Sequence, residues 1–167
     1  PPWKDVEDVL GGEAAARLQA ETRAELLAPS FLSKVQSAMA RGEEVQRSAS
    51  CVVLLGPSCA GKSELLRSGV LEEVRVALWV DGAFIREASE TWARVLELAR
   101  SKQLAGVANY FKDYFKAPMD EVKEQVVEEA IRLRANIAIP DTASNFKATA
   151  AMIDKLLTAR YKLNFVV

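Results

Sequence analysis

Residues 51–63 read Cys51-Val52-Val53-Leu54-Leu55-Gly56-Pro57-Ser58-Cys59-Ala60-Gly61-Lys62-Ser63, and this stretch decides the fold. Its first five residues form a continuous apolar run with the length of a buried strand. From Gly56 onward the residues match G-x-x-x-x-G-K-S without a gap, and residues 64–68 then read as the first turns of a helix. A strand that ends in such a loop and passes into a helix predicts an α/β fold.

The loop has the chemistry of a phosphate-binding cradle. Gly56 lets the chain turn off the strand, and Gly61 lets the backbone approach an anion closely. Lys62 can reach the outer phosphates, the Ser63 hydroxyl can hold Mg²⁺, and the positive end of the helix dipole faces the same site. The alternative, a Gly-rich turn that binds nothing, is disfavoured by the strand before the loop and the helix after it. We therefore predict that Mg-ATP or Mg-GTP binds to eight residues: Gly56, Pro57, Ser58, Cys59, Ala60, Gly61, Lys62 and Ser63.

Length and composition restrict the class of protein. With 167 residues, the chain has the size of one domain, with or without an appendage. Half of its residues are hydrophobic and 27% are charged, as in ordinary globular proteins. A net charge of -1 gives no electrostatic footprint for nucleic acid or for an anionic membrane. No apolar run reaches the length of a transmembrane helix. We therefore expect no nucleic-acid partner and no membrane partner.

The sequence contains no histidine, which excludes histidine general bases and histidine metal ligands. Its two cysteines do not make a zinc site. Cys51 opens the expected strand and Cys59 lies beyond its far end, roughly 15 Å away or more, which is too far for a disulfide. Both thiols are predicted to be reduced, and this favours an intracellular compartment.

Residues 1–50 are predicted to form a helical extension in front of a P-loop domain at residues 51–167. Ser30 is a candidate N-cap, after Pro29 has closed the helix before it. The second helix carries an apolar face with Phe31, Val35 and Met39. Two interpretations stay open: these helices pack on the domain, or they form a docking arm for a protein partner. The chain starts without methionine and ends inside an expected strand, so we expect a piece of a longer polypeptide, cut short at its C-terminus.

After the cradle helix, strand patterns and helix patterns alternate. The expected elements are a strand at Val74–Gly82, a helix at Glu87–Lys102, an aromatic segment at Val107–Lys116, a helix opened by Pro118 and ending at Arg134, a strand at Asn136–Asp141, a helix at Asn145–Arg160 and a strand at Tyr161–Val167. This alternation predicts a parallel sheet covered by helices on both faces. The aromatic segment is interpreted as core packing rather than as a base-stacking platform.

Two acids follow expected strands. Asp81 ends the second strand and Asp141 ends the third. Ligands of parallel α/β folds bind beyond the carboxyl ends of the strands, so both acids and the cradle should lie at one edge of the sheet. Asp141 could instead simply cap the helix that follows it. We expect at least one of the two to contact Mg²⁺ or a substrate.

Residues 51–167 resemble the zeta-toxin-like kinases, a branch of the P-loop kinases. The likeness lies in Leu55–Ser63 running into residues 66–68, in Val80-Asp81-Gly82-Ala83-Phe84-Ile85-Arg86-Glu87, and in Pro140-Asp141-Thr142. The resemblance implies a three-layer P-loop kinase-like fold and transfer of a phosphoryl group from ATP or GTP to a small-molecule hydroxyl. Bacterial members modify a nucleotide-activated amino sugar. It also implies that an acid after the second strand takes the hydroxyl proton and that arginines neutralise the transferring phosphoryl group.

The sequence departs from the family pattern at two positions. The family places its base two residues after a first acid, and that position is Ala83 here. After the third strand the family favours acid-Gly-Thr, whereas this chain has Pro140-Asp141-Thr142.

Two hypotheses about the function follow. In the first, the domain is a small-molecule kinase in which Asp81 is the base and Gly82 lets the backbone approach the acceptor. Ser63 and Asp141 are then the residues that help to bind Mg²⁺. In the second, it is a catalytically degenerate module that serves a larger assembly as a structural or nucleotide-binding subunit. A GTPase is disfavoured because D-x-x-G and N-K-x-D motifs are not evident.

Overall fold

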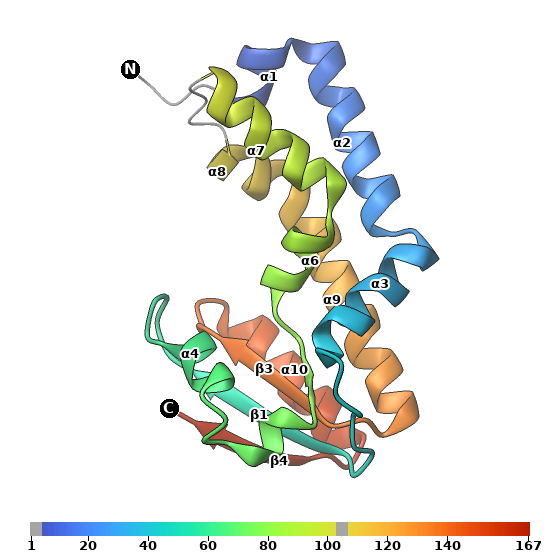
Figure 1. Cartoon of the computed structure of the whole chain (residues 1–167), viewed down its shortest axis with the longest axis vertical. Coiled ribbons are helices and arrows are strands. Elements are labelled where there is room, and N and C mark those ends of the chain that lie inside the picture. Colours follow the sequence, from blue (N-terminus) through green and yellow to red (C-terminus); the bar gives the residue numbers. More distant parts are fainter. Residues whose placement is uncertain (1–4, 103–106) are drawn as a thin grey trace. The chain divides into compact units, whose positions relative to one another are not determined.

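The computed structural model describes residues 5–102 and 107–167 (Figure 1). The chain forms two compact units, and each is built from two separate segments. Of the described residues, the helical unit contains 5–35, 82–102 and 107–125, and the sheet unit contains 36–81 and 126–167. The boundary between residues 50 and 51 stays a prediction, and residues 1–4 of the expected extension lie outside the described residues. None of the helices in the described ranges is long and apolar enough to cross a membrane.

Helices make up most of the described chain. In order they are α1 Val6–Leu10, α2 Gly12–Leu26, α3 Pro29–Ala40, α4 Lys62–Arg67, α5 Glu72–Arg75, α6 Gly82–Ala88, α7 Glu90–Lys102, α8 Val107–Tyr110, the π-helical turn η1 Phe111–Phe115, α9 Lys116–Leu133 and α10 Phe146–Thr158.

The sheet unit contains a four-stranded parallel sheet. Its strands are β1 Ser50–Leu55, β2 Leu78–Trp79, β3 Ile137–Asp141 and β4 Lys162–Val166, in the order β2-β3-β1-β4. β1 is an inner strand, and its residues Cys51–Leu54 are buried. This position explains why the sequence there is a continuous apolar run rather than an alternating one.

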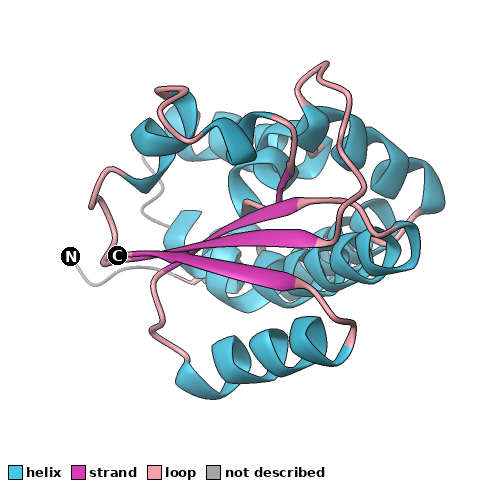
Figure 2. Ribbon diagram, turned by 90° about the horizontal axis from the view of Figure 1, so that it is seen from below, coloured by secondary structure: helices cyan, strands magenta, loops and turns pink. Residues whose placement is uncertain are grey.

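Helices lie on both faces of this sheet (Figure 2). Glu73 of α5 accepts a hydrogen bond from the Asn164 side chain of β4 at 2.8 Å. Lys155 of α10 pairs at 2.7 Å with Glu128 in the last part of α9, so these two helices neighbour each other. The crossovers from β1 to β2 and from β3 to β4 run in opposite directions across the sheet, and right-handed crossovers therefore place α4 and α10 on opposite faces. The predicted three-layer α/β fold is confirmed.

The second strand is much shorter than the prediction of Val74–Gly82. The chain forms α5 up to Arg75, and only Leu78 and Trp79 are strand. Side chains satisfy the carbonyl groups that a longer strand would have paired. The Trp79 indole donates to the Val74 carbonyl at 2.8 Å, and the Arg41 guanidinium donates to the carbonyls of Arg75 at 2.8 Å and Ala77 at 3.1 Å. Arg41 also lies 3.7 Å over the Trp79 ring, and burial lowers its pKa.

Two prolines have other positions than the sequence predicted. Pro29 opens α3 instead of closing the preceding helix, so Ser30 lies inside α3 and is not its N-cap. Proline suits the first turn because the N–H that it lacks has no helical partner there. Pro118 lies within α9, which begins at Lys116 directly after η1. The Lys116 N–H donates to the Phe111 carbonyl, five residues back, and this wider turn lets the helix pass through the proline.

The core of the helical unit is aromatic. The rings of Tyr110 and Phe115 are fully buried. The centroid of the Trp92 ring lies 5.9 Å from the ring centroid of Tyr110, 6.0 Å from that of Phe111 and 4.9 Å from that of Phe115. The Tyr110 hydroxyl shares a hydrogen bond of 2.8 Å with Thr22 of α2, and burial raises the Tyr110 pKa. The interpretation of this segment as core packing is confirmed.

The apolar face expected on the second N-terminal helix is not free to dock a partner. Phe31, Val35 and Met39 are 5%, 0% and 0% exposed, respectively. Of the two interpretations of residues 1–50, packing within the chain is therefore correct for these three side chains. The hydrophobic effect accounts for this, since each burial removes a large apolar side chain from water.

Glu25 of α2 caps the first turn of α7. Its carboxylate accepts hydrogen bonds from the Ser89 hydroxyl at 2.9 Å, from the backbone N–H groups of Glu90 at 2.5 Å and Thr91 at 3.1 Å, and from the Thr91 hydroxyl. The first N–H groups of a helix have no partner within the helix, and a negative charge beside them is favourable. Glu25 therefore joins two helices that are distant in sequence.

Replacing Glu25 by Ala is expected to lower the free energy of unfolding by about 1–3 kcal/mol, because hydrogen bonds to a charged group are lost. Urea unfolding of both proteins measures the change. Glu13→Ala is the matched control, since Glu13 also lies on α2 but its side chain is 91% exposed in a surface ion pair with Arg17. That control should change stability by less than about 0.5 kcal/mol. Equal losses in the two variants would contradict the capping role.

Candidate functional site

The Gly-rich loop joins the end of β1 to the start of α4. Gly61 has φ 79°, in the left-handed region, and is the N-cap residue of α4. A side chain at this position would strain the backbone. A Cβ built on Gly56 would lie 3.4 Å from the Ala60 Cβ and 3.9 Å from the Lys62 Cδ, which are contact distances. Gly61 therefore serves the turn into α4, and its close approach to an anion stays a prediction.

Lys62 is folded onto the loop that it follows. Its ammonium group donates to the Gly56 carbonyl at 2.6 Å and to the Pro57 carbonyl at 2.7 Å. A phosphate that bound in this loop would offer charged oxygens to the same ammonium group, and such bonds are stronger than those to neutral carbonyls. Ser63, the second residue of α4, is exposed, so its hydroxyl is accessible to a ligand.

The outer part of the loop is open to solvent. Pro57, Ser58, Cys59 and Ala60 are all exposed. Cys59 has φ 63°, which is uncommon for a residue other than glycine. Its neighbours in the turn hold it in that conformation, and such strained positions cluster at ligand-binding loops.

Asp141 lies directly beside the cradle. It pairs with Leu55 in the parallel register of β3 and β1, and its carbonyl accepts a hydrogen bond of 3.2 Å from the Gly56 N–H. One carboxylate oxygen accepts from the Ala143 N–H at 2.9 Å, and the other accepts from the Thr149 hydroxyl at 2.8 Å. Each oxygen keeps further acceptor capacity. The carboxylate is thus held in place by its own loop and by α10.

Thr149 was not singled out from the sequence. It is 8% exposed, and its hydroxyl donates to Asp141 while also lying 3.1 Å from the Asn145 carbonyl. The sequence did contain a signal for this contact. When an acid ends a strand and a helix follows, a threonine in the first turn of that helix can donate a hydrogen bond back to the acid. The alternative role considered for Asp141, as the cap of α10, belongs to Asn145, whose side chain accepts from the Ala148 N–H.

Asp81 lies at the same edge of the sheet, farther from the cradle. Trp79 pairs with Ala138 of β3, and the Val80 N–H donates to the Ala138 carbonyl at 2.9 Å, so Asp81 follows β2 at its carboxyl end. With β3 between β2 and β1, Asp81 lies roughly 10 Å to the side of the cradle strand, which is two strand spacings. The three elements share one edge, and Asp141 is the nearer acid.

Gly82 packs closely against Met119, and the approach of its backbone to an acceptor stays a prediction. It is buried, and a Cβ built on it would lie 2.9 Å from the sulfur of Met119 and 3.2 Å from its terminal carbon. Both residues belong to the helical unit. The missing side chain therefore makes room for Met119.

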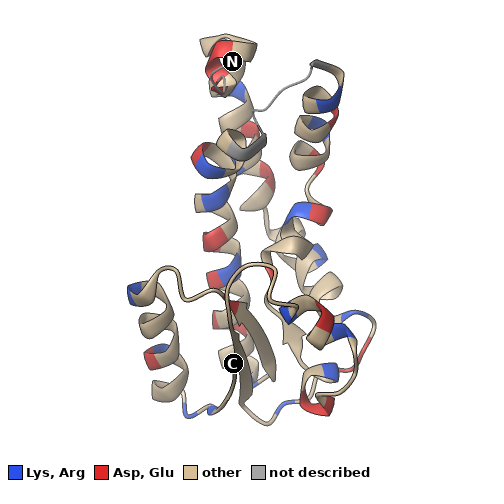
Figure 3. Ribbon diagram, turned by 90° about the vertical axis from the view of Figure 1, so that its left-hand side faces the viewer, with Lys and Arg blue, Asp and Glu red and all other residues tan. Residues whose placement is uncertain are grey.

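Charge does not favour one polyanionic partner. Basic and acidic residues are interspersed along the longer helices (Figure 3), and the short helix α1 carries Glu7 and Asp8 without a basic residue. Within the described ranges, no three His, Cys, Asp or Glu side chains come together in a group that could hold a metal ion. A Mg²⁺ ion at Ser63 and Asp141 would therefore need phosphate oxygens as further ligands, which is the usual arrangement for this ion.

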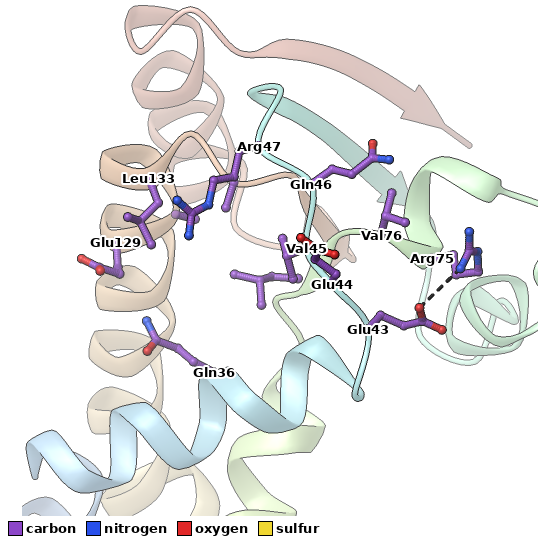
Figure 4. Close-up of a pocket in the computed structure, with 13 residues that line it drawn as sticks. Gln36, Glu43, Glu44, Val45, Gln46, Arg47, Arg75, Val76, Glu129 and Leu133 are labelled. Carbon is purple, nitrogen blue, oxygen red and sulfur yellow. Dashed lines mark hydrogen bonds and ion pairs between the residues drawn. The ribbon is translucent and has the colours of Figure 1, made fainter.

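A separate pocket of about 830 Å³ lies in the sheet unit (Figure 4). Its walls come from residues 43–47, from Arg75–Leu78 and from the last turns of α9, where Glu129 and Leu133 contribute. Arg75 and Glu43 form an ion pair of 3.3 Å at its rim. These segments precede β1, β2 and β3, so the pocket lies at the amino ends of the strands. The cradle lies at the opposite ends, and the pocket is not part of it.

The two cysteines are free and differ in environment. Cys51 is buried, and burial raises its pKa to about 12, whereas Cys59 is exposed in the cradle. The thiolate is the reactive form. At pH 8 iodoacetamide is therefore expected to modify Cys59 and to spare Cys51, with both modified after unfolding in urea. Mass spectrometry of peptides measures this, and labelling of Cys51 in the folded protein would contradict the buried position of β1.

The parallel sheet, with a G-x-x-x-x-G-K-S loop after its inner strand β1, defines a P-loop kinase-like α/β fold. No family model matches the sequence, and no curated protein matches it. Among solved structures, the chain is similar to one from the PezAT chromosomal toxin–antitoxin system of Streptococcus pneumoniae, with 20% sequence identity and a TM-score of 0.63. The match covers 83% of this chain and 56% of that chain, so this chain spans little more than half of its length. The resemblance to the zeta-toxin-like kinases is thereby confirmed for the fold.

Proposed function

We propose that the protein binds Mg-ATP or Mg-GTP through Gly56–Ser63 and transfers a phosphoryl group to a small-molecule hydroxyl. Lys62 would hold the outer phosphates, and Ser63 and Asp141 would hold Mg²⁺ together with phosphate oxygens. When bound, the metal neutralises charge on the transferring group. Asp81 would take the proton of the acceptor hydroxyl.

One observation carries the proposal. The loop after β1 has left-handed Gly61 at the helix start, with Lys62 directly behind it and its side chain turned back onto the loop. Backbone N–H groups at such a turn, together with the positive end of α4, favour an anion. Asp141 and Asp81 lie at the same edge of the sheet, where parallel α/β folds bind their ligands.

The second candidate function is a catalytically degenerate module that keeps nucleotide binding or only the fold. Ala83 favours it, because this residue occupies the position where the zeta-toxin-like kinases carry a base. The similar solved structure belongs to a toxin–antitoxin system, and this supports a protein partner for the present chain as well. The two free cysteines fit an intracellular setting.

Two measurements separate the candidates. Calorimetric titration with Mg-ATP and Mg-GTP tests for nucleotide binding, and incubation with nucleotide labelled at the γ-phosphate tests for transfer to nucleotide-sugars and small polyols. Binding with transfer supports the kinase, whereas binding without transfer supports the degenerate module. A folded protein that binds neither nucleotide at millimolar concentration would contradict nucleotide binding altogether.

A further inference from the structure

Phe146 is an aromatic side chain that the fold leaves in solvent. It is 78% exposed, against 50% for Phe165. Phe146 is the first residue of α10, and the Asn145 side chain caps that helix by accepting from the Ala148 N–H at 3.2 Å. The capped start of α10 therefore fixes the backbone position of Phe146. The ring itself is little stabilised by burial, because most of its surface is in solvent.

Phe146 follows β3, the strand that pairs with the cradle strand β1. Asp141 pairs with Leu55, and its carbonyl accepts from the Gly56 N–H, so β3 ends beside the first residue of the cradle. From Asp141 to Phe146 the chain can span at most roughly 17 Å, and the turn at Ala143 shortens that distance. Phe146 therefore stands at the ligand-binding edge of the sheet, one strand from the cradle.

Hydrogen bonds hold the loop that presents the ring. The Ala143 N–H donates to the Asp141 carboxylate at 2.9 Å, and the Thr142 hydroxyl donates to the Ser144 hydroxyl at 2.9 Å. The Thr149 hydroxyl donates to the other Asp141 oxygen at 2.8 Å. The loop thus has a defined shape before any ligand binds.

The backbone of this loop shares an uncommon feature with the cradle. Ala143 has φ 52°, and Cys59 in the cradle has φ 63°. The left-handed conformations of Arg41 and Arg134 follow directly after α3 and α9, and that of Arg160 follows the C-cap residue of α10, where helix ends commonly adopt them. Ala143, Cys59 and Ala49 (φ 51°) have no such helix end before them. Ala143 and Cys59 lie beyond the carboxyl ends of neighbouring strands, where strained residues are typical of ligand sites, whereas Ala49 directly precedes β1.

We propose that Phe146 is the stacking surface for a nucleobase bound at this edge of the sheet. This inference rests on the proposed function and adds a residue that contacts the nucleobase rather than the phosphates. Every base has a π face, so an exposed aromatic ring can stack on it without base-specific hydrogen bonds. The base can belong to the nucleotide whose phosphates the cradle holds or to a nucleotide-linked acceptor, and the ring chemistry is the same for both.

The test compares ligands that contain a base with one that has none. Wild type and Phe146→Ala are titrated with Mg-ATP, with Mg-GTP, with a nucleotide-activated amino sugar and with Mg-tripolyphosphate. The loss of stacking should weaken binding of the base-containing ligand roughly five- to a hundredfold. Affinity for tripolyphosphate should not change. A loss for the purine nucleotides assigns the base to the phosphate donor, and a loss for the nucleotide-sugar alone assigns it to the acceptor.

Matched variants separate stacking from other effects. Phe146→Trp should keep the affinity, because it keeps an aromatic face, whereas Phe146→Leu should bind as weakly as the Ala variant. Leu157→Ala is the surface control, since Leu157 is 54% exposed on the same helix about three turns away. It should leave all affinities unchanged.

Two results would overturn the inference while the proposed function stands. One is equal affinity of wild type and Phe146→Ala for every base-containing ligand that binds. The other is an equal loss for tripolyphosphate and nucleotides, which would show damage to the cradle instead. If wild type binds neither nucleotide nor tripolyphosphate, the proposed function fails and this inference fails with it.

Discussion

Replacing Asp81 by Asn is expected to lower phosphoryl transfer by roughly 10²- to 10⁴-fold, the contribution typical of a general base. Asparagine keeps the size of the side chain but cannot take the proton of the acceptor hydroxyl. Because Asp81 lies beyond β2, with β3 between it and the cradle strand, nucleotide affinity should change little. Single-turnover transfer from labelled nucleotide measures the rate, and calorimetry measures the affinity.

Asp154→Asn is the matched control for this prediction. Asp154 is an exposed acid on α10, and the same substitution there removes the same charge at a distance from the sheet edge. Its rate should equal that of wild type. If Asp81→Asn also transfers phosphate at the wild-type rate, Asp81 is not the base. If wild type binds nucleotide but transfers to no tested acceptor, the degenerate module is the better description.

Replacing Lys62 by Ala is expected to weaken binding of Mg-nucleotide about ten- to a hundredfold, because a charge-assisted bond to phosphate is commonly worth about 1.5–3 kcal/mol. Transfer should fall as well, since the same contact holds the outer phosphates. In the structure the ammonium group already bonds to the Gly56 and Pro57 carbonyls. The variant therefore also removes two contacts that shape the loop without nucleotide.

A second lysine supplies the control. Lys147 is exposed on the first turn of α10, so Lys147→Ala removes one positive charge at the same end of the sheet without touching the loop. Only Lys62→Ala should show the full loss of affinity. Equal losses would indicate general electrostatic attraction instead of a specific phosphate contact. Thermal unfolding of both variants checks that the loop change leaves the fold intact.

The sequence predicted the central part of the fold because the signals there are local and agree with one another. Residues 51–63 combine an apolar run, a glycine turn and a helix start, and each needs only its neighbours to be recognised. The third and fourth strands and α10 were predicted within one or two residues of their positions in the structure. The common edge of Asp81, Asp141 and the cradle then follows from parallel pairing alone.

Where the prediction was wrong, distant residues decided the structure. Arg41 satisfies carbonyl groups around residue 75 and so allows a short β2, and this contact crosses more than thirty positions of sequence. The apolar spacing of Phe31 and Met39 was not a wrong prediction but left packing and docking both open, and the burial of these side chains in the fold decides for packing. Thr149 reaches Asp141 through a turn whose shape depends on left-handed Ala143. Local periodicity carries none of this information.

The division of each compact unit between two distant segments has a consequence for synthesis on the ribosome. β1 pairs with the edge strand β4 from Ser50–Lys162 onward, so this pairing cannot form until residues 162–166 have emerged. In the helical unit, Arg23 of α2 likewise pairs with Glu121 of α9, which lies 98 positions later in the sequence. Contacts of such high order in sequence slow folding and leave apolar strands unpaired meanwhile. Nascent chains that end near residue 130 should therefore depend on chaperones more strongly than chains that include residues 1–167.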